Sequence, residues 1–463
     1  MFNKTKIVAT IGPASDNYDT IKKLILNGVN VVRANFSHGS GEDHKHKFDI
    51  AKQISKELNI SIATLLDTKG PEIRIGKVEN NIVKIEKNQT LELLCDANVY
   101  ADYVGNSQRV CVSYEMHKDL KIGDEVLLDD GKLKTVVQNI IDNVVYVKTF
   151  NGHNLKTNKR INIPGIEFSL PFLSKKDKQD ILFGISYGVD IIAASFVNSK
   201  ENLIELREFL KNNGGENIRV CSKIESVSGV KNIVDIINYS DSIMIARGDL
   251  GLEIPYYNVP DIQKFIIKEC NKLNKEVIVA TQMLDSMEKS PLPTRAEVTD
   301  VYWANELGTD ATMLSGETAS GNFPDRSVFI MNEINKKAQS DFIQDTISYR
   351  YYIDKLFFES NPKEYYAYDL AQKTHDEKIE YIFVYTENPE NLKIISKYRP
   401  YSKIIAIFDK KSKNNSIALI HNVTSLYDNE EEFNNFSKTH QPSQKILDQF
   451  NIDDSVKFKA LKI

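Results

Sequence analysis

The chain has 463 residues, of which 41% are hydrophobic and 27% charged, and its formal net charge is -5. This composition is typical of a globular protein with two or three domains, and the small net charge excludes a global attraction to nucleic acid or to an anionic membrane. No apolar run approaches the roughly 18 residues that a membrane span requires, and the first predicted strand starts so near Met1 that we expect no signal peptide.

Short apolar runs alternate with amphipathic helical stretches over most of the chain. Eight such runs occur, at residues 6–11, 31–36, 61–66, 190–197, 219–224, 242–246, 276–281 and 310–314. Continuous apolar strands separated by helices predict a parallel sheet that is covered on both faces. Eight of them predict a closed (β/α)8 TIM barrel, with an open doubly wound sheet as the alternative.

Residues typical of helix ends agree with this pattern. Gly28 follows the predicted helix of residues 18–27, where a C′ glycine ends a helix. Thr294 and Glu297 have capping-box spacing just before the predicted helix of residues 298–307.

Between residues 67 and 174 the pattern of apolar strands separated by helices is interrupted. Alternating strands are predicted at residues 82–86, 91–94, 125–128 and 144–148, with turn residues at positions 130–131 and 142–143. We expect a small all-β domain, residues 71–170, inserted after the third barrel strand. The barrel is then formed by residues 1–70 and 171–340. Because the insert leaves the C-terminal end of a barrel strand, where barrel active sites lie, we expect it to act as a lid.

The last part of the chain, residues 341–463, is predicted to form a separate α/β domain. Strands are expected at residues 381–385 and 403–407. Residues 408–463 are polar, with only short apolar pieces, so a strand or two is expected there and no functional site.

Polar residues stand at the C-terminal ends of six of the eight predicted barrel strands. These residues are Arg33, Asn35, Ser37, Asp67, Thr68, Lys223, Glu225, Asp249, Thr281, Ser315 and Glu317. The C-terminal ends of barrel strands meet at one mouth, so we expect these side chains to converge there.

Lys223 and Glu225 are two apart in one strand and therefore face the same side. A lysine beside carboxylates in apolar strands is expensive unless it is paired. A divalent cation between Glu225 and Asp249, with Lys223 meeting an anion on that cation, would explain the pattern, because oxygen ligands are what magnesium prefers. This arrangement indicates phosphoryl transfer. The alternatives are ordinary rim carboxylates and a purely structural ion pair between Arg33 and Asp67.

Two further local features have both a functional and a structural interpretation. The turn RGDLG at residues 247–251 carries two glycines that allow an anion to approach the backbone, and a helix starting there would favour a substrate carboxylate. The alternative is a plain strand-to-helix turn. The cysteines, Cys95, Cys111, Cys221 and Cys270, form no CxxC pair. We expect them to be packing residues of a protein in a reducing cytoplasm.

Taken together, these motifs resemble those of the pyruvate kinase family. The segments are TKIVATIGPAS (5–15), NFSHG (35–39), LDTKGPEIR (66–74), IARGDLG (245–251), ATQML (280–284), PTRAEV (293–298) and MLSGET (313–318). The resemblance covers residues 4–335 in the right order. It implies the barrel, the inserted β lid and the C-terminal α/β domain. It also implies a cytoplasmic, homotetrameric phosphotransferase of glycolysis that transfers the phosphoryl group of phosphoenolpyruvate to ADP.

The resemblance also implies cofactors and residue roles. The cofactors would be Mg2+ (or Mn2+) and K+. The catalytic residues would be Lys223, Arg33 and Thr281, and the substrate would be bound by Arg33, Lys223, Gly248, Asp249 and Thr281. The divalent metal would be held by Glu225 and Asp249, and potassium by Asn35, Ser37, Asp67 and Thr68. The nucleotide would meet Asn35, Ser37, His38, Arg74 and Lys159. Glu72 goes with potassium dependence, and a hydroxyl–water relay near Thr281 or Ser315 would protonate the enolate.

The chain departs from the family pattern at three places. Arg160 stands where the family usually has glycine, next to Lys159. The sugar-phosphate loop, usually rich in Ser and Thr, corresponds to residues 385–391, where Glu387 and Glu390 would repel a phosphate. No glycine-rich effector loop is recognisable near the C-terminus. We therefore expect that fructose bisphosphate does not activate the protein.

Two other functions remain open at this point. A metal-dependent aldolase or lyase acting on an enolpyruvate could use the same carboxylate pair, because a fold does not fix its chemistry. Lys159, Arg74 and the lid favour a nucleotide substrate instead. A non-catalytic homologue with a binding role is suggested by the altered C-terminal domain, but the complete set of strand-end residues argues against it.

Overall fold

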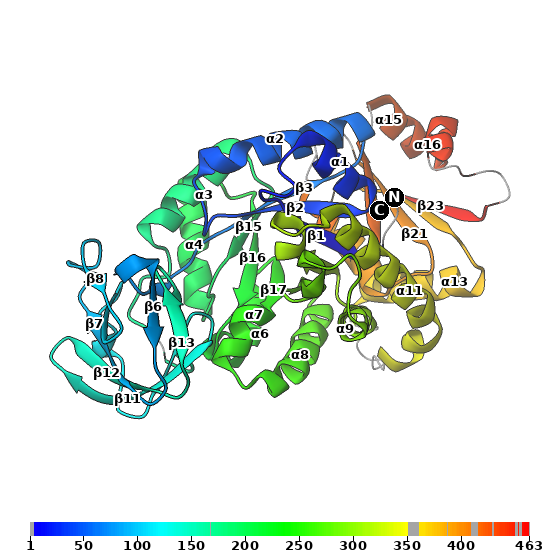
Figure 1. Ribbon diagram of the computed structural model, residues 1–463. Coiled ribbons are helices and arrows are strands. Elements are labelled where there is room, and N and C mark those ends of the chain that lie inside the picture. The colour runs from blue at the N-terminus through cyan, green and yellow to red at the C-terminus, as the bar shows by residue number, and fades with distance from the viewer. Residues whose placement is uncertain are drawn as a thin grey trace.

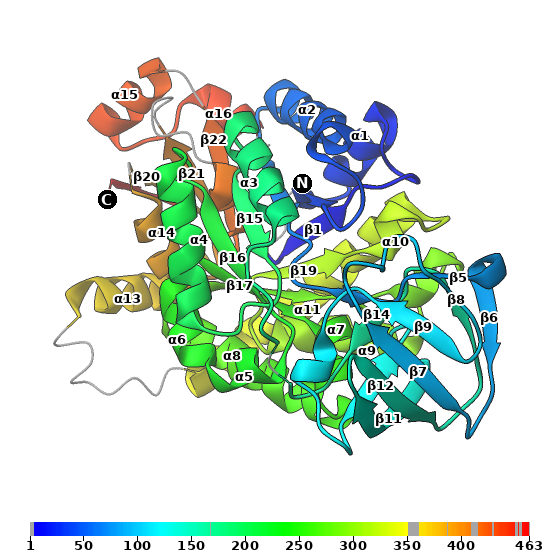
Figure 2. The same cartoon turned by 90° about the vertical axis from the view of Figure 1, so that its left-hand side faces the viewer.

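The structure is a computed structural model that describes residues 4–166, 168–350, 361–386, 388–408, 415–427, 430–449, 452 and 456–462. Figure 1 and Figure 2 show a central barrel with a small β domain on one side and a second α/β sheet on the other. Glu387, to which we assigned a role in the C-terminal loop, lies outside the described residues. None of the helices in the described ranges is both long and apolar enough to cross a membrane.

The central barrel is closed by eight parallel strands in the order β1-β19-β18-β17-β16-β15-β3-β2. The strands are β1 (Lys6–Thr10), β2 (Val29–Asn35), β3 (Ala63–Asp67), β15 (Ile191–Ala194), β16 (Arg219–Ile224), β17 (Ser242–Ala246), β18 (Glu276–Ala280) and β19 (Ala311–Leu314). Each overlaps one of the eight predicted apolar runs, because strands covered on both faces are apolar throughout. The predicted barrel is confirmed, and the open doubly wound sheet is excluded.

Helices surround the barrel strands. They are α1 (Tyr18–Leu26), α2 (Gly41–Leu58), α3 (Lys175–Tyr187), α4 (Lys200–Asn212), α5 (Val227–Lys231), α6 (Ile233–Tyr239), α7 (Arg247–Glu253), α8 (Val259–Lys272), α9 (Arg295–Glu306), α10 (Gly316–Ala319) and α11 (Pro324–Arg350). Gly28 has φ of 121° just beyond the end of α1, as a residue in this position requires. The capping box of Thr294 and Glu297 forms at the start of α9.

The inserted domain is built on a seven-stranded sheet in the order β4-β14-β10-β11-β12-β7-β9, with two small pairs, β13-β6 and β5-β8. Its strands are β4 (Ile73–Arg74), β5 (Lys77–Val78), β6 (Ile82–Ile85), β7 (Thr90–Cys95), β8 (Val104–Gly105), β9 (Arg109–Val112), β10 (Glu125–Leu128), β11 (Leu133–Ile141), β12 (Val144–Thr149), β13 (His153–Lys156) and β14 (Arg160–Asn162). Asp130 and Asp142 have positive φ in the two predicted turns. The domain has its own apolar core.

The C-terminal part holds a parallel four-stranded sheet in the order β22-β21-β20-β23. Its strands are β20 (Tyr381–Tyr385), β21 (Lys403–Phe408), β22 (Val423–Tyr427) and β23 (Phe458–Lys462), and its helices are α13 (Pro362–Asp376), α14 (Pro389–Lys397), α15 (Glu430–Thr439) and α16 (Gln444–Gln449). The predicted α/β architecture is confirmed, and β22 and β23 account for the apolar pieces of the polar tail.

The C-terminal part closes the barrel at the N-terminal end of its strands. Ala418 and Leu419, in the short helix η6 (Asn415–Leu419), belong to the same buried cluster as the side chains inside the barrel. Nearby, the Lys6 ammonium at the start of β1 donates a hydrogen bond of 2.7 Å to the Val423 carbonyl. The bottom of the barrel is therefore filled by a segment that comes more than a hundred residues after its last strand.

Replacing Leu419 by alanine should destabilise the chain by about 3 kcal/mol, because removing a buried leucine side chain leaves a cavity. Urea unfolding would measure the change. Leu26→Ala is the control, since Leu26 on α1 is 46% exposed and its loss should change stability by less than about 1 kcal/mol. Equal losses in the two variants would contradict the packing described for Leu419.

Candidate active site

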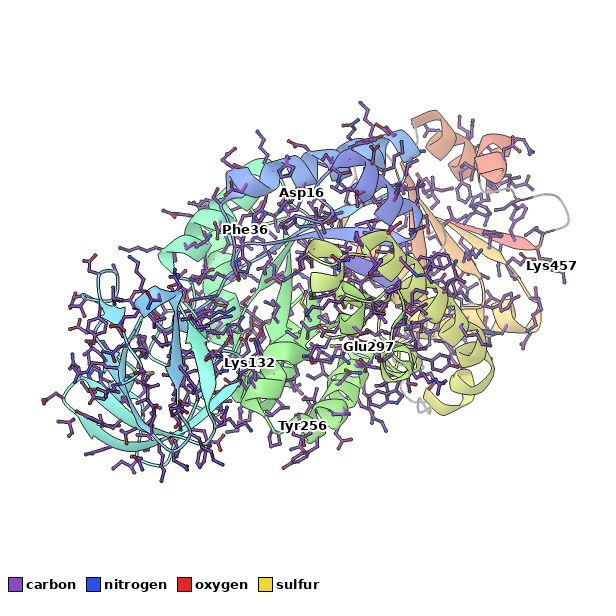
Figure 3. The ribbon with its side chains drawn as sticks, in the orientation of Figure 1. Asp16, Phe36, Lys132, Tyr256, Glu297 and Lys457 are labelled. Atoms are coloured by element: carbon purple, nitrogen blue, oxygen red, sulfur yellow. The ribbon has the colours of Figure 1, made fainter. Side chains whose placement is uncertain are left out.

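Seven of the predicted strand-end residues line one cavity of about 90 Å³ at the C-terminal mouth of the barrel. They are Arg33, Asn35, Ser37, Lys223, Glu225, Asp249 and Thr281. Phe36, labelled in Figure 3, lies between two of them in sequence, and its ring instead packs against Phe183 of α3, with ring centroids 6.0 Å apart. The alternation along the end of β2 therefore sends polar side chains into the cavity and the aromatic ring away from it.

Asp67 is the centre of a charged network beneath this cavity. Its Oδ2 accepts from Arg33 Nε at 2.7 Å, and its Oδ1 accepts from Lys223 Nζ at 3.0 Å. Burial would raise the pKa of Asp67, but the charges of Lys223 and Arg33 outweigh burial and hold that pKa below its usual range. The Arg33–Asp67 ion pair that we considered as a structural alternative does form, yet the same carboxylate also holds Lys223 and so belongs to the site.

Lys223 is surrounded by acceptors. Its Nζ lies 3.0 Å from Glu225 Oε1 and 2.7 Å from Ser195 Oγ, in addition to Asp67. Burial would lower the pKa of Lys223, but the negative charges of Asp67 and Glu225 outweigh it and raise the pKa above its usual value. The ammonium therefore stays protonated at neutral pH and faces the cavity as a fixed positive charge.

Glu225 is 1% exposed and accepts a hydrogen bond from the Phe196 backbone N–H at 2.8 Å. Burial raises the pKa of this carboxyl group, and the neighbouring charges of Asp249 and Asp67 raise it further against the opposing effect of Lys223. A carboxylate in this position is stabilised by any cation placed between it and Asp249.

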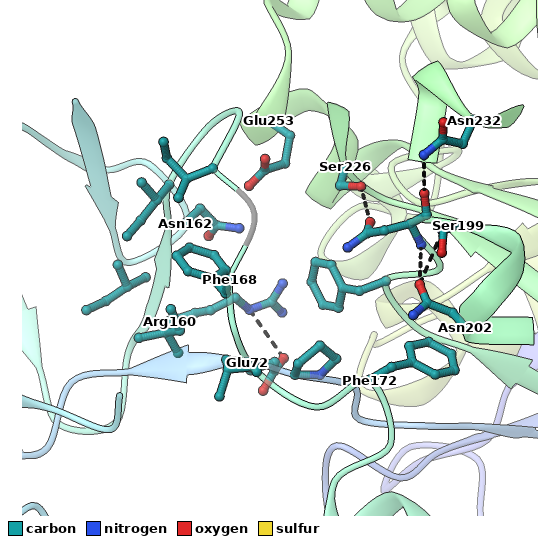
Figure 4. A pocket seen from close by; sticks show the side chains of 18 residues that line it. Glu72, Arg160, Asn162, Phe168, Phe172, Ser199, Asn202, Ser226, Asn232 and Glu253 are labelled. Atoms are coloured by element: carbon teal, nitrogen blue, oxygen red, sulfur yellow. Dashed lines mark hydrogen bonds and ion pairs between the residues drawn. The ribbon is translucent and has the colours of Figure 1, made fainter. Parts of the chain in front are cut away.

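Asp249, in the first turn of α7, is in contact with the lid. Its Oδ1 accepts a hydrogen bond from Arg160 NH1. Arg160 opens strand β14, and its Nε lies 3.4 Å from Glu72 Oε1 (Figure 4). The arginine that departs from the family pattern thus joins the lid to the barrel.

Thr281 follows β18 with φ of 69°, a conformation that β-branched residues rarely adopt. Its hydroxyl accepts from the Gly248 N–H at 2.7 Å and donates to the Ala280 carbonyl at 2.6 Å. The hydroxyl therefore fixes the backbone at the start of α7. Backbone strain of this kind concentrates at functional sites.

Comparison with known proteins agrees with this geometry. The family model described as "Pyruvate kinase, barrel domain" matches residues 2–328. A pyruvate kinase of Clostridium perfringens is 38% identical over 461 residues, which covers 98% of this chain and 94% of that protein. One from Mycoplasma pneumoniae is 40% identical over 446 residues, with coverage of 87% and 86%.

A solved structure, a pyruvate kinase from Cryptosporidium parvum, has a TM-score of 0.84 and 35% identity, and the match covers 92% of this chain and 87% of that one. The chain belongs to the pyruvate kinase family. It is accordingly a phosphotransferase rather than an aldolase or lyase.

Some of the residues that the pyruvate kinase motifs suggested lie outside the cavity lining. Arg74 contacts Glu72, with NH2 2.7 Å from Oε2, and Lys159 lies 3.0 Å from Asp129 Oδ1 within the lid. His38 is exposed, and its backbone carbonyl accepts from His44 Nε2. These three side chains are not among the residues that line the 90 Å³ cavity.

The residues after the eighth strand, Ser315 and Glu317, were expected at the barrel mouth but do not line the cavity. The Glu317 carboxylate accepts from the backbone N–H groups of Leu284 and Ser315, so it holds loops rather than facing the cavity. The Ser315 hydroxyl has no hydrogen-bond partner among the described residues and does not line the cavity. Thr281 does line it, but the choice between these two hydroxyls as a relay to the enolate remains a prediction.

Besides Lys69 and Phe196, which line the cavity, sequence reasoning missed two hydroxyl residues of this pyruvate kinase site. Ser195 follows the fourth barrel strand, and its hydroxyl contacts Lys223. Thr10 ends the first strand and accepts from Arg33 NH1 at 2.6 Å. Both are polar residues at the C-terminal ends of barrel strands, like the residues that were predicted. Applying this criterion to all eight strands would have identified them.

Oxygen atoms at the site fit the two cations that the family implies. The described residues contain no group of three or more His, Cys, Asp or Glu that could hold a metal ion, and two carboxylates with substrate and water oxygens are a usual set for magnesium. The mutual repulsion of Glu225 and Asp249 supports a cation between them. The charged Asp67 carboxylate lies near the Thr68 carbonyl, which accepts from Ser195 Oγ, and oxygens of this kind suit potassium.

Proposed function

We propose that the protein transfers the phosphoryl group of phosphoenolpyruvate to ADP, giving pyruvate and ATP in glycolysis. The observation that carries this proposal is the protonated Lys223 in one cavity with Arg33 and a carboxylate pair. The bond between phosphorus and the enol oxygen breaks, and a bond from phosphorus to a terminal β-phosphate oxygen of ADP forms. The enolate that remains takes a proton at its methylene carbon and becomes pyruvate.

The residues act through charge and position. Arg33 and Lys223 bind the phosphoryl group, and Lys223 also stabilises the negative charge that develops on the enol oxygen. Gly248, Asp249 and Thr281 position the carboxylate end of the substrate. The lid excludes water, so that the phosphoryl group passes to ADP rather than to solvent. The nucleotide is bound by Asn35, Ser37, His38, Arg74 and Lys159.

Two cations complete the site in this proposal. Glu225 and Asp249 would hold Mg2+ or Mn2+, which neutralises phosphate charge when bound. Asn35, Ser37, Asp67 and Thr68 would hold K+, consistent with glutamate at position 72, and it would add a further positive charge. We also propose a cytoplasmic homotetramer, and light scattering of the purified protein would test the assembly.

A coupled assay that follows pyruvate tests the function. Pyruvate should form from phosphoenolpyruvate only when ADP and a divalent cation are both present, and replacing K+ by an organic monovalent cation should lower the rate. Release of pyruvate without ADP would contradict a kinase, and full activity without potassium would contradict the potassium site.

Fructose bisphosphate should leave the KM for phosphoenolpyruvate unchanged. Glu390 lies in the first turn of α14, in the loop region that corresponds to the sugar-phosphate site, and is paired with Lys393 at 2.6 Å. This carboxylate would oppose a bound phosphate. Steady-state kinetics with and without the sugar provide the test, and a large fall in KM would show that an effector site exists.

A further inference from the structure

Arg160 occupies the position between the lid and the proposed metal site. It is the first residue of β14, and its guanidinium spans from Glu72, near the start of the lid, to Asp249 on the barrel. Its side chain is 24% exposed, so the contact is largely shielded from water. The arginine therefore lies on one of the two carboxylates that we propose for the divalent cation.

Among the described residues, Arg160 is the one cationic side chain in ion-pair contact with Asp249. Of the other cations that line the cavity, Arg33 is paired with Asp67, and Lys223 with Asp67 and Glu225. Arg160 therefore supplies the direct ion-pair partner of Asp249 in the described part of the chain when no metal is bound. A divalent cation and this guanidinium would compete for the same carboxylate oxygens.

Arg160 also stands between two cavities. The 90 Å³ cavity and a larger one of about 360 Å³ share Glu72, Arg160 and Phe196 in their walls. The larger cavity lies between Asn162 on the lid and Ser199, Ser226 and Glu253 on the barrel, as Figure 4 shows. Moving the Arg160 side chain would remove part of the wall between the two cavities and one of the contacts that hold the lid on the barrel.

We propose that Arg160 is a positioning residue that acts as a counter-ion for Asp249. In the metal-free enzyme its contact with Asp249 holds the lid against the barrel, and binding of the divalent cation displaces it. This inference rests on the proposed function, because it takes Glu225 and Asp249 as the metal ligands. Because binding of the cation must first break the Arg160 contact, the metal affinity of the free enzyme is reduced by the stability of that contact. Metal binding and lid position become coupled, and the coupling is reciprocal.

The test measures Mn2+ binding to the full-length protein without substrates, from the electron paramagnetic resonance signal of free Mn2+. Arg160→Ala should lower the dissociation constant for Mn2+ by about tenfold, which corresponds to a contact of about 1.4 kcal/mol. Arg160→Lys, which keeps the charge but not the planar fork, should give an intermediate value. Arg109→Ala is the matched control, because Arg109 also opens a lid strand and pairs with a glutamate, Glu92, away from the site.

Hydrogen exchange of the two segments that join the lid to the barrel, residues 68–72 and 163–166, gives a second readout. Mn2+ should increase exchange there in the parent protein. In Arg160→Ala exchange should be fast from the start, and Mn2+ should leave it unchanged. A purely structural role for Arg160 would speed exchange without changing the affinity for Mn2+.

Two results would overturn the proposal. The first is a dissociation constant for Mn2+ in Arg160→Ala that equals or exceeds that of the parent protein. The second is a gain in Arg109→Ala as large as that in Arg160→Ala. Glu225→Gln separates this failure from failure of the proposed metal site. If Glu225→Gln loses Mn2+ binding while Arg160→Ala is unchanged, only the role of Arg160 is wrong, and if Glu225→Gln binds Mn2+ normally, the metal site itself is wrong.

Discussion

Replacing Lys223 by methionine should lower kcat at least about a thousandfold, because a preorganised charge aimed at developing negative charge contributes several kcal/mol to the transition state. Methionine has a similar length and no charge, so it fills the space without the ammonium. Binding of Mn2+ should persist, since Glu225 and Asp249 remain. Steady-state assays and Mn2+ titration measure the two effects separately.

Lys132→Met is the control for this prediction. Lys132 lies on the lid with its side chain 59% exposed, near Asp129. The same chemical change there should leave kcat within about twofold, as expected for surface positions away from the chemistry. A near-normal kcat for Lys223→Met would show that Lys223 does not stabilise the transferring phosphoryl group.

Replacing Glu225 by glutamine should weaken Mn2+ binding by about a hundredfold and reduce kcat/KM by a similar factor or more, since one of two carboxylate ligands loses its charge. Glutamine keeps an oxygen that can still accept the Phe196 N–H, so the local backbone should be retained. Raising the Mg2+ concentration should recover part of the activity.

The matched control is Glu253→Gln. Glu253 ends α7 and lines the 360 Å³ cavity but not the smaller one. Burial raises its pKa to about 7, with a smaller contribution from Asp249. The isosteric change at Glu253 should leave Mn2+ affinity nearly unchanged, and equal losses at the two positions would indicate a general electrostatic effect instead of coordination by Glu225.

The barrel was predictable because its strands are apolar on both faces and each is separated from the next by helical sequence. The convergence at its mouth followed from topology alone: parallel strands bring Arg33, Lys223 and Thr281 together although they are far apart in sequence. Local turns and caps, such as the box at Thr294 and Glu297, follow from residue type and spacing.

Other features depend on contacts between distant segments that no local pattern encodes. The sequence marked Arg160 as unusual, but only the folded lid places it on Asp249, 89 residues later. The hydroxyl of Ser195 became part of the site through Lys223, a partner in the neighbouring strand. The residue roles at the site remain predictions that the experiments above address, and the limits of each domain remain predictions as well.

The filling of the barrel bottom by Ala418 and Leu419 has a practical consequence. A shortened protein that stops after α11 would keep every residue proposed for chemistry. It would, however, expose the apolar interior at the N-terminal end of the barrel and remove the Val423 carbonyl that accepts a hydrogen bond from Lys6. Such a fragment should aggregate rather than serve as a minimal enzyme. Changes to the sequence of the C-terminal region should therefore keep Ala418 and Leu419 packed inside the barrel.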